Sequence, residues 1–153
     1  MSRGRVTPRF SRRDLLVAWA AATLFSGLPS TLHALATGAD VLEATRAAGA
    51  MLVGPDRTLA ALIAAAALVH PAISLFWTWI FGRLLPRRRV APWAVLGSAA
   101  VAVLDLRVIA PPLFPAVAAL PFWPQFVDHL MWGACLGLTL QVRQSRRARA
   151  DRR

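Results

Sequence analysis

The chain contains no lysine, no tyrosine and a single cysteine, and acidic side chains are scarce. One cysteine, Cys135, excludes an intramolecular disulfide and any CxxC redox or zinc motif. Charged residues make up only 16% of the 153 residues, against roughly 25% in a typical soluble domain. A soluble fold of this size could not bury a composition that is 57% hydrophobic. The sequence therefore indicates an integral membrane domain.

Arginine supplies all 18 basic side chains, and 15 of these arginines fall into three clusters beside long apolar stretches. The clusters lie within residues 3–13, 83–89 and 143–153. The other three arginines, Arg46, Arg57 and Arg107, lie on the opposite side of the apolar stretches. Because basic flanks stay on the cytoplasmic side of a bilayer, this pattern predicts a bundle of four transmembrane helices with N and C termini in the cytoplasm.

The predicted all-α membrane fold divides into seven segments. We expect a basic tail at 1–14, membrane spans at 15–36, 58–81, 90–109 and 121–142, a short amphipathic helix on the outer side at 40–53, and a second basic tail at 143–153. About 20 apolar residues cross the hydrocarbon core, and each span approaches that length. Pro29 is expected to kink the first span, and Pro111 to end the third. Asp40 and Glu43 have the spacing of a capping box that would begin the outer helix.

The N-terminal region also resembles an export signal. Arg12 and Arg13 form a twin-arginine pattern, and Ala34-Leu35-Ala36 resembles a signal-peptidase site. Cleavage there would leave three spans in the mature protein. The twin-arginine route exports folded soluble domains, none follows in this sequence, and the apolar run is long enough to span. The uncleaved four-span arrangement is therefore the prediction.

Ionisable residues at membrane depth are costly, and each suggests a functional role. The candidate polar intramembrane cluster consists of His33, His70, Asp105, Arg107, Asp128 and His129. At about 1.5 Å per residue, all of these except the deeper His70 are predicted near one level in the outer part of the membrane. Such a cluster could relay protons, bind a metal or line a substrate pocket. In the structural alternative, Arg107 pairs with Asp128 or Asp105, and each histidine bonds a neighbouring helix.

Residue spacing does not favour a metal site or a haem. The patterns HxxxH and HExxH are absent, and the adjacent residues Asp128 and His129 point about 100° apart on a helix. We therefore predict no catalytic residue and no cofactor. Basic clusters beside apolar spans favour membrane lipids over nucleic acid as partners. Gly133 and Gly137 form a GxxxG motif for close helix packing, within the bundle, in a homo-oligomer or with another membrane protein.

From residue 69 onward the chain resembles the YagU family of small bacterial inner-membrane proteins. The short motifs that carry the resemblance are Val69-His70, Ile73-Ser74, Leu85-Pro86, Pro111-Pro112-Leu113-Phe114, Leu120-Pro121-Phe122-Trp123 and His129-Leu130-Met131-Trp132. The resemblance covers roughly half of the chain and implies a multi-helix protein of the bacterial cytoplasmic membrane. It supplies no catalytic residue to carry over, and it does not extend to His33.

Two functions are compatible with these residues. The first is a non-enzymatic, multi-pass inner-membrane protein that acts through helix–helix or lipid contacts, for example in envelope stress. The alternative is a small oligomeric proton-linked transporter or channel that uses intramembrane aspartate and histidine side chains. Four helices form a narrow bundle, so a transport path would need an oligomer interface. A membrane enzyme ranks third, since no nucleophile has a supporting pattern.

Overall fold

The computed structural model describes residues 10–150 and 152, and this part of the chain is all-helical. Its elements are α1 (Arg12–Phe25), α2 (Leu28–Thr37), α3 (Glu43–Val53), α4 (Leu59–Leu84), α5 (Val90–Val103), the π-helix η1 (Leu104–Ile109), α6 (Ala110–Leu113), α7 (Pro115–Ala118) and α8 (Phe122–Ala150). Arg3, Arg5, Arg9 and Arg153 of the predicted basic tails lie outside the described residues.

Three stretches of this part of the chain are long and apolar enough to cross a membrane. They are Arg12–Thr37, Leu59–Leu84 and Val90–Leu113. The all-α prediction is therefore confirmed, together with three helical stretches of membrane-spanning length. The last helix, α8, is not among the three, although it is longer than each of them. It continues from the expected fourth span into most of the predicted C-terminal tail.

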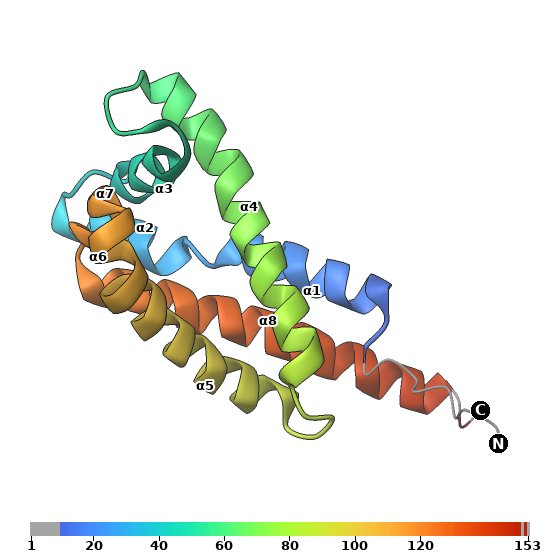
Figure 1. Ribbon diagram of the computed structural model, residues 1–153. Helices are drawn as coiled ribbons and strands as arrows, with labels where there is room; N and C mark the ends of the chain where they lie inside the picture. The colour runs from blue at the N-terminus through green and yellow to red at the C-terminus, as the bar shows by residue number, and fades with distance from the viewer. Residues whose placement is uncertain (1–9, 151, 153) are drawn as a thin grey trace.

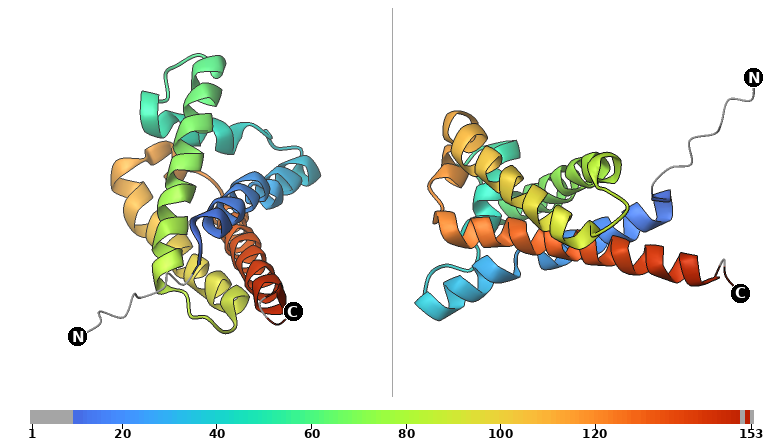
Figure 2. Two further views of the ribbon diagram at one scale, coloured as in Figure 1. Left: turned by 90° about the vertical axis from the view of Figure 1, so that its right-hand side faces the viewer. Right: turned by 90° about the horizontal axis from the view of Figure 1, so that it is seen from below.

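Helix α8 is the axis of the bundle (Figure 1). On one side α5 packs along it, and on another side α1 and then α2 lie against it (Figure 2). Helix α4 crosses α1 and diverges from α5 and α8 toward its own N-terminal end (Figure 1). Helix α3 folds back onto that end of α4, with α7 beside it. The bundle is thus a wedge, with its narrow end at the start of α1.

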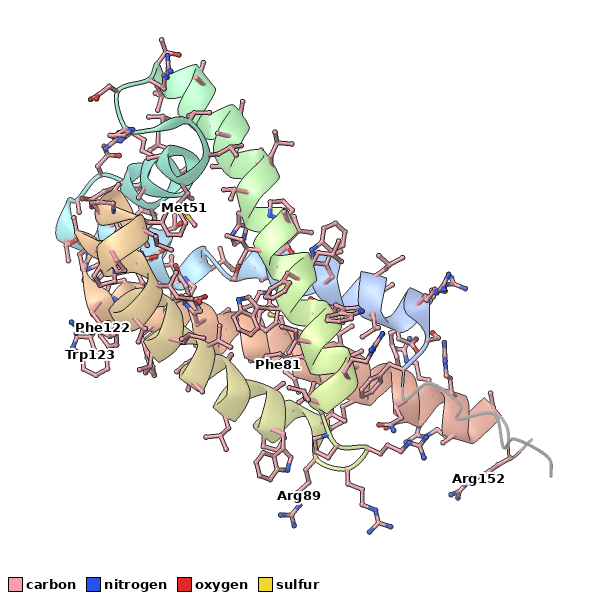
Figure 3. The ribbon with its side chains drawn as sticks, in the orientation of Figure 1. Met51, Phe81, Arg89, Phe122, Trp123 and Arg152 are labelled. Carbon is pink, nitrogen blue, oxygen red and sulfur yellow. The ribbon has the colours of Figure 1, made fainter. Side chains whose placement is uncertain are left out.

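The main hydrophobic core fills the narrow end of the wedge. The ring of Phe81 on α4 meets the ring of Trp132 on α8 edge to face, with 5.2 Å between the ring centroids. Figure 3 shows Phe81 where α4 approaches α5 and α8. Leu136 and Leu140 of α8 and Val90 of α5 are fully buried in the same cluster. This packing fixes α4, α5 and α8 relative to one another at that end.

A buried ion pair joins the two ends of the described chain. The side chain of Asp14 on α1 is almost fully buried, and its carboxylate lies 2.6 Å from Nε of Arg143 and 2.9 Å from Nη2 of Arg147 on α8. Ser11 and Asp14 also form a capping box at the start of α1. The start of α1 and the end of α8 therefore lie together, as Figure 1 also shows.

Small residues allow α5 and α8 to approach closely. A Cβ atom added at Gly133 would lie 2.7 Å from the carbonyl oxygen of Ala94, and one added at Gly137 would lie 2.7 Å from Cα of Ala91. Real Cβ atoms essentially never come within 3.0 Å of such atoms. The GxxxG face is thus packed inside one chain, against α5.

The first predicted span consists of two helices. Helix α1 ends at Phe25 and α2 begins at Leu28, so the break falls at Ser26 and Gly27. We expected Pro29 to kink this span, and the break lies in the turn directly before Pro29. A proline ring clashes with the carbonyl group four residues earlier, which here belongs to Phe25, the last residue of α1. Pro29 lies in the first turn of α2, where the missing N–H of proline removes no hydrogen bond.

The third predicted span does not stop where we expected. After η1 the chain stays helical through Pro111 and Pro112 to Leu113. The two prolines lie in the first turn of α6. In an ordinary helix interior a proline ring clashes with the carbonyl group four residues earlier, and the wider π-turn that precedes α6 relieves that crowding.

The outer helix begins later than predicted. Helix α3 starts at Glu43 with Leu42 as its N-cap, and no side chain caps it. Asp40 does not form the expected capping box. Its Oδ1 accepts a hydrogen bond from the backbone N–H of Leu42 at 2.8 Å, and its Oδ2 pairs with Arg46. The carboxylate thus orders the turn before α3, and the helix itself packs on α4.

Candidate functional site

A cavity of about 560 Å³ occupies the wide part of the wedge. Its walls come from the end of α1, the start of α2, the segment from Val41 through α3, the first two-thirds of α4, and parts of α5, η1 and α8. Four residues of the predicted cluster line it, namely His70, Asp105, Asp128 and His129. The other polar side chains in its lining are Thr23, Ser26, Ser30, Thr31, Thr45, Ser74, Trp77, Gln125 and Trp132.

Asp128 caps the helix that begins at the break. Its Oδ1 accepts a hydrogen bond from the backbone N–H of Ser30 at 2.9 Å. The N-cap position of α2 is Gly27, which has no side chain that could accept this bond. The first N–H groups of a helix lack partners within the helix and carry partial positive charge, so a carboxylate is stabilising there. Helix α8 therefore supplies the cap that the sequence of α2 lacks.

His70 lies at the other side of the same break. Its Nε2 is 3.3 Å from the carbonyl oxygen of Thr23 and 3.4 Å from Oγ of Ser26. Carbonyl groups in the last turn of a helix lack N–H donors within that helix. A carbonyl oxygen can only accept, so Nε2 carries a proton when this bond is made. The imidazole thus covers the end of α1 as Asp128 covers the start of α2.

The π-helix brings Asp105 to His129. Oδ2 of Asp105 lies 3.5 Å from Nε2 of His129. The other ring nitrogen, Nδ1, lies 2.8 Å from the carbonyl oxygen of Gln125 and therefore carries a proton. A favourable contact at Nε2 then requires one further proton, held either by the imidazole as a cation or by the carboxyl group. In either case the pair carries no net charge.

Hydrogen bonds separate the cavity from the narrow end of the bundle. Trp132 Nε1 donates to Oγ of Ser74 at 2.8 Å, and Ser74 Oγ lies 2.7 Å from Oγ1 of Thr23. Trp19 Nε1 donates to the carbonyl oxygen of Pro71 at 3.0 Å. The network links α1, α4 and α8 at the level where Trp132 also meets Phe81. Thr23, Ser74 and Trp132 also line the cavity, so this network ties the cavity wall to the core.

Two residues of the predicted cluster lie away from the cavity. The guanidinium carbon of Arg107 lies 4.2 Å from the ring centroid of Phe122, a cation–π contact. The predicted pairing of Arg107 with Asp128 or Asp105 is therefore wrong for the described part of the chain. His33 is exposed on α2 and is not part of the cavity lining.

The sequence did not reveal the groups that complete the site. The backbone N–H of Ser30 and the hydroxyl group of Thr23 carry no distinctive pattern, although several small polar residues interrupt the first apolar run. Ser74 and Trp132 occur in the motifs of the family resemblance, but nothing there indicated that they bond to each other. Within residues 10–150 and 152, no group of three or more His, Cys, Asp or Glu side chains could hold a metal ion.

The candidate site therefore combines a cavity, a broken helix, a π-helix and two carboxylate contacts. Irregular backbone at membrane depth is tolerated where it is buried in protein or lines a cavity. The helix break at Ser26 and Gly27 and the π-helix η1 both contribute residues to the lining of this cavity. π-Helices also occur frequently at functional sites. Comparisons of the chain with protein-family models, with curated proteins and with solved structures found no match.

Proposed function

We propose that the protein is a four-span protein of the bacterial cytoplasmic membrane that acts as a small proton-linked transporter. The observation that carries this proposal is the contact between the carboxyl group of Asp105 and the imidazole of His129 in the lining of a large cavity. Asp128 and His70 line the same cavity, on either side of the helix break. Discontinuous helices are the places where many transporters bind substrates and coupling ions.

The packing of the helices supports α8 as the fourth span and both termini in the cytoplasm. The end of α8 pairs with the start of α1 through Arg143 and Asp14. The start of α5 also lies there, since the backbone N–H of Ala91 donates to Oε1 of Gln141 at 3.2 Å. The basic turn at 83–89 joins α4 to this end. Within the described residues, Arg12 and Arg13, the turn at 83–89 and the arginines at the end of α8 lie at one end of the bundle, which agrees with the positive-inside rule.

Cysteine labelling tests this topology. Cys135→Ser removes the single native thiol, after which Asp56→Cys or Ser145→Cys introduces a thiol at a chosen end. In intact cells a membrane-impermeant maleimide should label position 56 and not position 145. Permeabilised cells should label both positions. Labelling of position 145 in intact cells would contradict the four-span arrangement.

Protonation offers a way to couple the cavity to helix movement. A charged Asp128 stabilises the start of α2 electrostatically, and the neutral acid loses most of that effect. A proton taken up there would weaken the attachment of α2 to α8. Because the Thr23–Ser74–Trp132 network ties α1, α4 and α8 together at the cavity wall, transport past it would require either movement of these helices or an interface in a homo-oligomer.

Proton flux in proteoliposomes tests the proposal. We expect an imposed proton gradient to decay faster with the wild-type protein than with empty liposomes, as reported by an enclosed pH-sensitive dye. Asp128→Asn and His129→Ala should each lower this flux at least tenfold. Asp56→Asn, which removes a carboxylate from the loop before α4, should leave the flux unchanged. Absence of flux at every pH from acid to neutral would remove the transporter function.

The second candidate function is action through helix–helix or lipid contacts. Its supporting observation is a set of large apolar side chains that are exposed along α1 and α2, namely Leu24, Phe25, Leu28, Leu32 and Leu35. The GxxxG face gives it no support, since α5 already covers Gly133 and Gly137. The family resemblance and a role in envelope stress remain predictions.

A further inference from the structure

We infer that the cavity between α4 and α8 binds an organic cation with an apolar body. This inference rests on the proposed function, because it assigns a substrate class to the same cavity. It follows from the charge of the cavity lining, from the size and composition of its walls, and from the way in which the cavity reaches the surface of the protein.

The charge of the cavity is opposite to that of the chain as a whole. The protein has a formal net charge of +11. The described residues that line the cavity include two carboxylates, Asp105 and Asp128, two histidines, His70 and His129, and no arginine. Asp105 and His129 together are neutral once they share the proton that their contact requires, so Asp128 leaves the lining with a net negative charge. Arg107 is only two residues from Asp105, yet its guanidinium group lies over Phe122. The structure thus keeps the nearest arginine out of a cavity whose own charge attracts a cation.

The walls of the cavity favour an organic cation over a metal ion. A volume of about 560 Å³ falls in the range of small-molecule sites. Ile63 and Ile73 of α4 and Val101 of α5 provide apolar surface that a bare ion cannot use. Trp77 and Trp132 also line the cavity, and indole rings attract cations through their π-electrons. A ligand with a positive head and a hydrophobic body matches both kinds of wall.

The cavity also reaches the lateral surface of the bundle. Leu24 at the end of α1 and Leu28 at the start of α2 line it, and both side chains are exposed to the surroundings. In a bilayer this edge faces the acyl chains. An amphiphilic cation that partitions into the membrane can therefore approach the carboxylates from the lipid as well as from the outer solution.

Two probes of matched shape and opposite charge test the inference. Tetraphenylphosphonium and tetraphenylborate differ mainly in the sign of their charge, and tetrapropylammonium is a smaller cation. The purified full chain in a neutral detergent is titrated with each probe by calorimetry at neutral pH. We expect saturable binding of at least one cation and at least tenfold weaker binding of the borate. Binding of neither cation, or equal binding of the borate, would overturn the inference.

Matched variants locate the site. Asp105→Asn and Asp128→Asn should each weaken cation binding at least tenfold, because each removes a carboxyl group from the lining while preserving the size of the side chain. Asp56→Asn removes the same charge outside the cavity and should change the affinity less than twofold. Cation binding that is unaffected in both cavity variants would place the ligand elsewhere and contradict the assignment.

The binding experiment and the proton-flux experiment test the two proposals independently of each other. Cation binding without proton flux would leave this inference standing and remove the transport function. Proton flux without cation binding would keep the proposed function and reject the organic cation as its substrate.

Discussion

The carboxylate of Asp128 accepts a hydrogen bond from the backbone N–H of Ser30, 98 residues earlier in the chain. This bond joins the last helix to the break in the first apolar stretch. It makes the start of α2 depend on a side chain that also lines the cavity. A change at this carboxyl group would therefore reach both the cavity and the position of α2.

Substitution of Asp128 should lower the stability of the protein, and the loss should be larger when the new side chain has no hydrogen-bond acceptor. Asp128→Ala leaves the N–H of Ser30 without its partner, and we expect a loss of about 1–3 kcal/mol in unfolding free energy. Asp128→Asn keeps a carbonyl acceptor of the same size and should lose about half as much or less. Denaturant unfolding in detergent measures both changes. Equal stability of the alanine variant and the wild type would show that the bond does not hold α2.

The buried ion pair at the narrow end should matter more than its neighbouring charges. Arg143→Gln removes a charged hydrogen bond to Asp14, which is 3% exposed, and should cost about 1.5–3 kcal/mol. Arg146→Gln removes an equal charge from the same arginine cluster but not from the pair. Thermal melting of the two variants compares them. A similar melting temperature for both would mean that general charge, rather than this contact, stabilises the α1–α8 pair.

Close packing of α5 on α8 predicts that a methyl group added at the contact lowers stability more than one added elsewhere on α5. Gly133→Ala forces a Cβ atom against the rigid carbonyl of Ala94 and should cost about 1–3 kcal/mol. Gly97→Ala meets the ring of Phe81 at 3.0 Å, a contact that a shift of a few tenths of an ångström relieves. Alanine also favours helix over glycine, so this second variant should cost less than the first. Unfolding curves that rank the two variants in the opposite order would contradict the α5–α8 contact.

The turn before α3 should respond to acid. A hydrogen bond from the backbone N–H of Leu42, together with the Arg46 guanidinium, lowers the pKa of Asp40 below its ordinary value. A carboxyl group with a lowered pKa in the folded state stabilises the fold above its unfolded pKa. That contribution is lost as pH falls through the folded pKa. The stabilisation of this turn by the Asp40 carboxylate should therefore be fully present at neutral pH and decline only below about pH 4.

Arg46→Gln tests the cause of this shift. The substitution should raise the pKa of Asp40 toward its ordinary value, as followed by carbon NMR of the carboxyl group. Arg57→Gln is the control, because Arg57 donates to the carbonyl oxygen of Val53 and does not contact Asp40. An Asp40 pKa that stays unchanged in the Arg46 variant would assign the shift to Leu42 alone.

The sequence predicted the helices better than their interruptions. The span expected at 58–81 corresponds to α4, Leu59–Leu84, because an uncharged apolar run of that length has few other structures available. A kink near Ser26 and Gly27 was expected from Pro29, but the contact that holds the new helix was not. The start of that helix is capped by Asp128, and no local pattern announces a partner 98 residues away.

Position along the helices was predictable from residue spacing, whereas the direction in which a side chain points around its helix was not. Residue spacing grouped Asp105, Asp128 and His129 at one level, and all three line the cavity. The same reasoning included Arg107, which lies over Phe122 instead. The π-helix η1 changes the angle between successive residues, so a regular helical wheel gives the wrong direction for side chains within it.

The pairing of Asp14 with Arg143 sets an order of events during synthesis. The two residues are 129 positions apart, and at ribosomal rates of about 5–20 residues per second Asp14 is made roughly 6–26 s before its partner. For that interval the first helix of a nascent chain carries an acid whose arginines do not yet exist. The carboxylate of Asp14 finds its arginine partners only after α8 has been synthesised. We therefore expect quality-control proteases to degrade a chain that is arrested before residue 143.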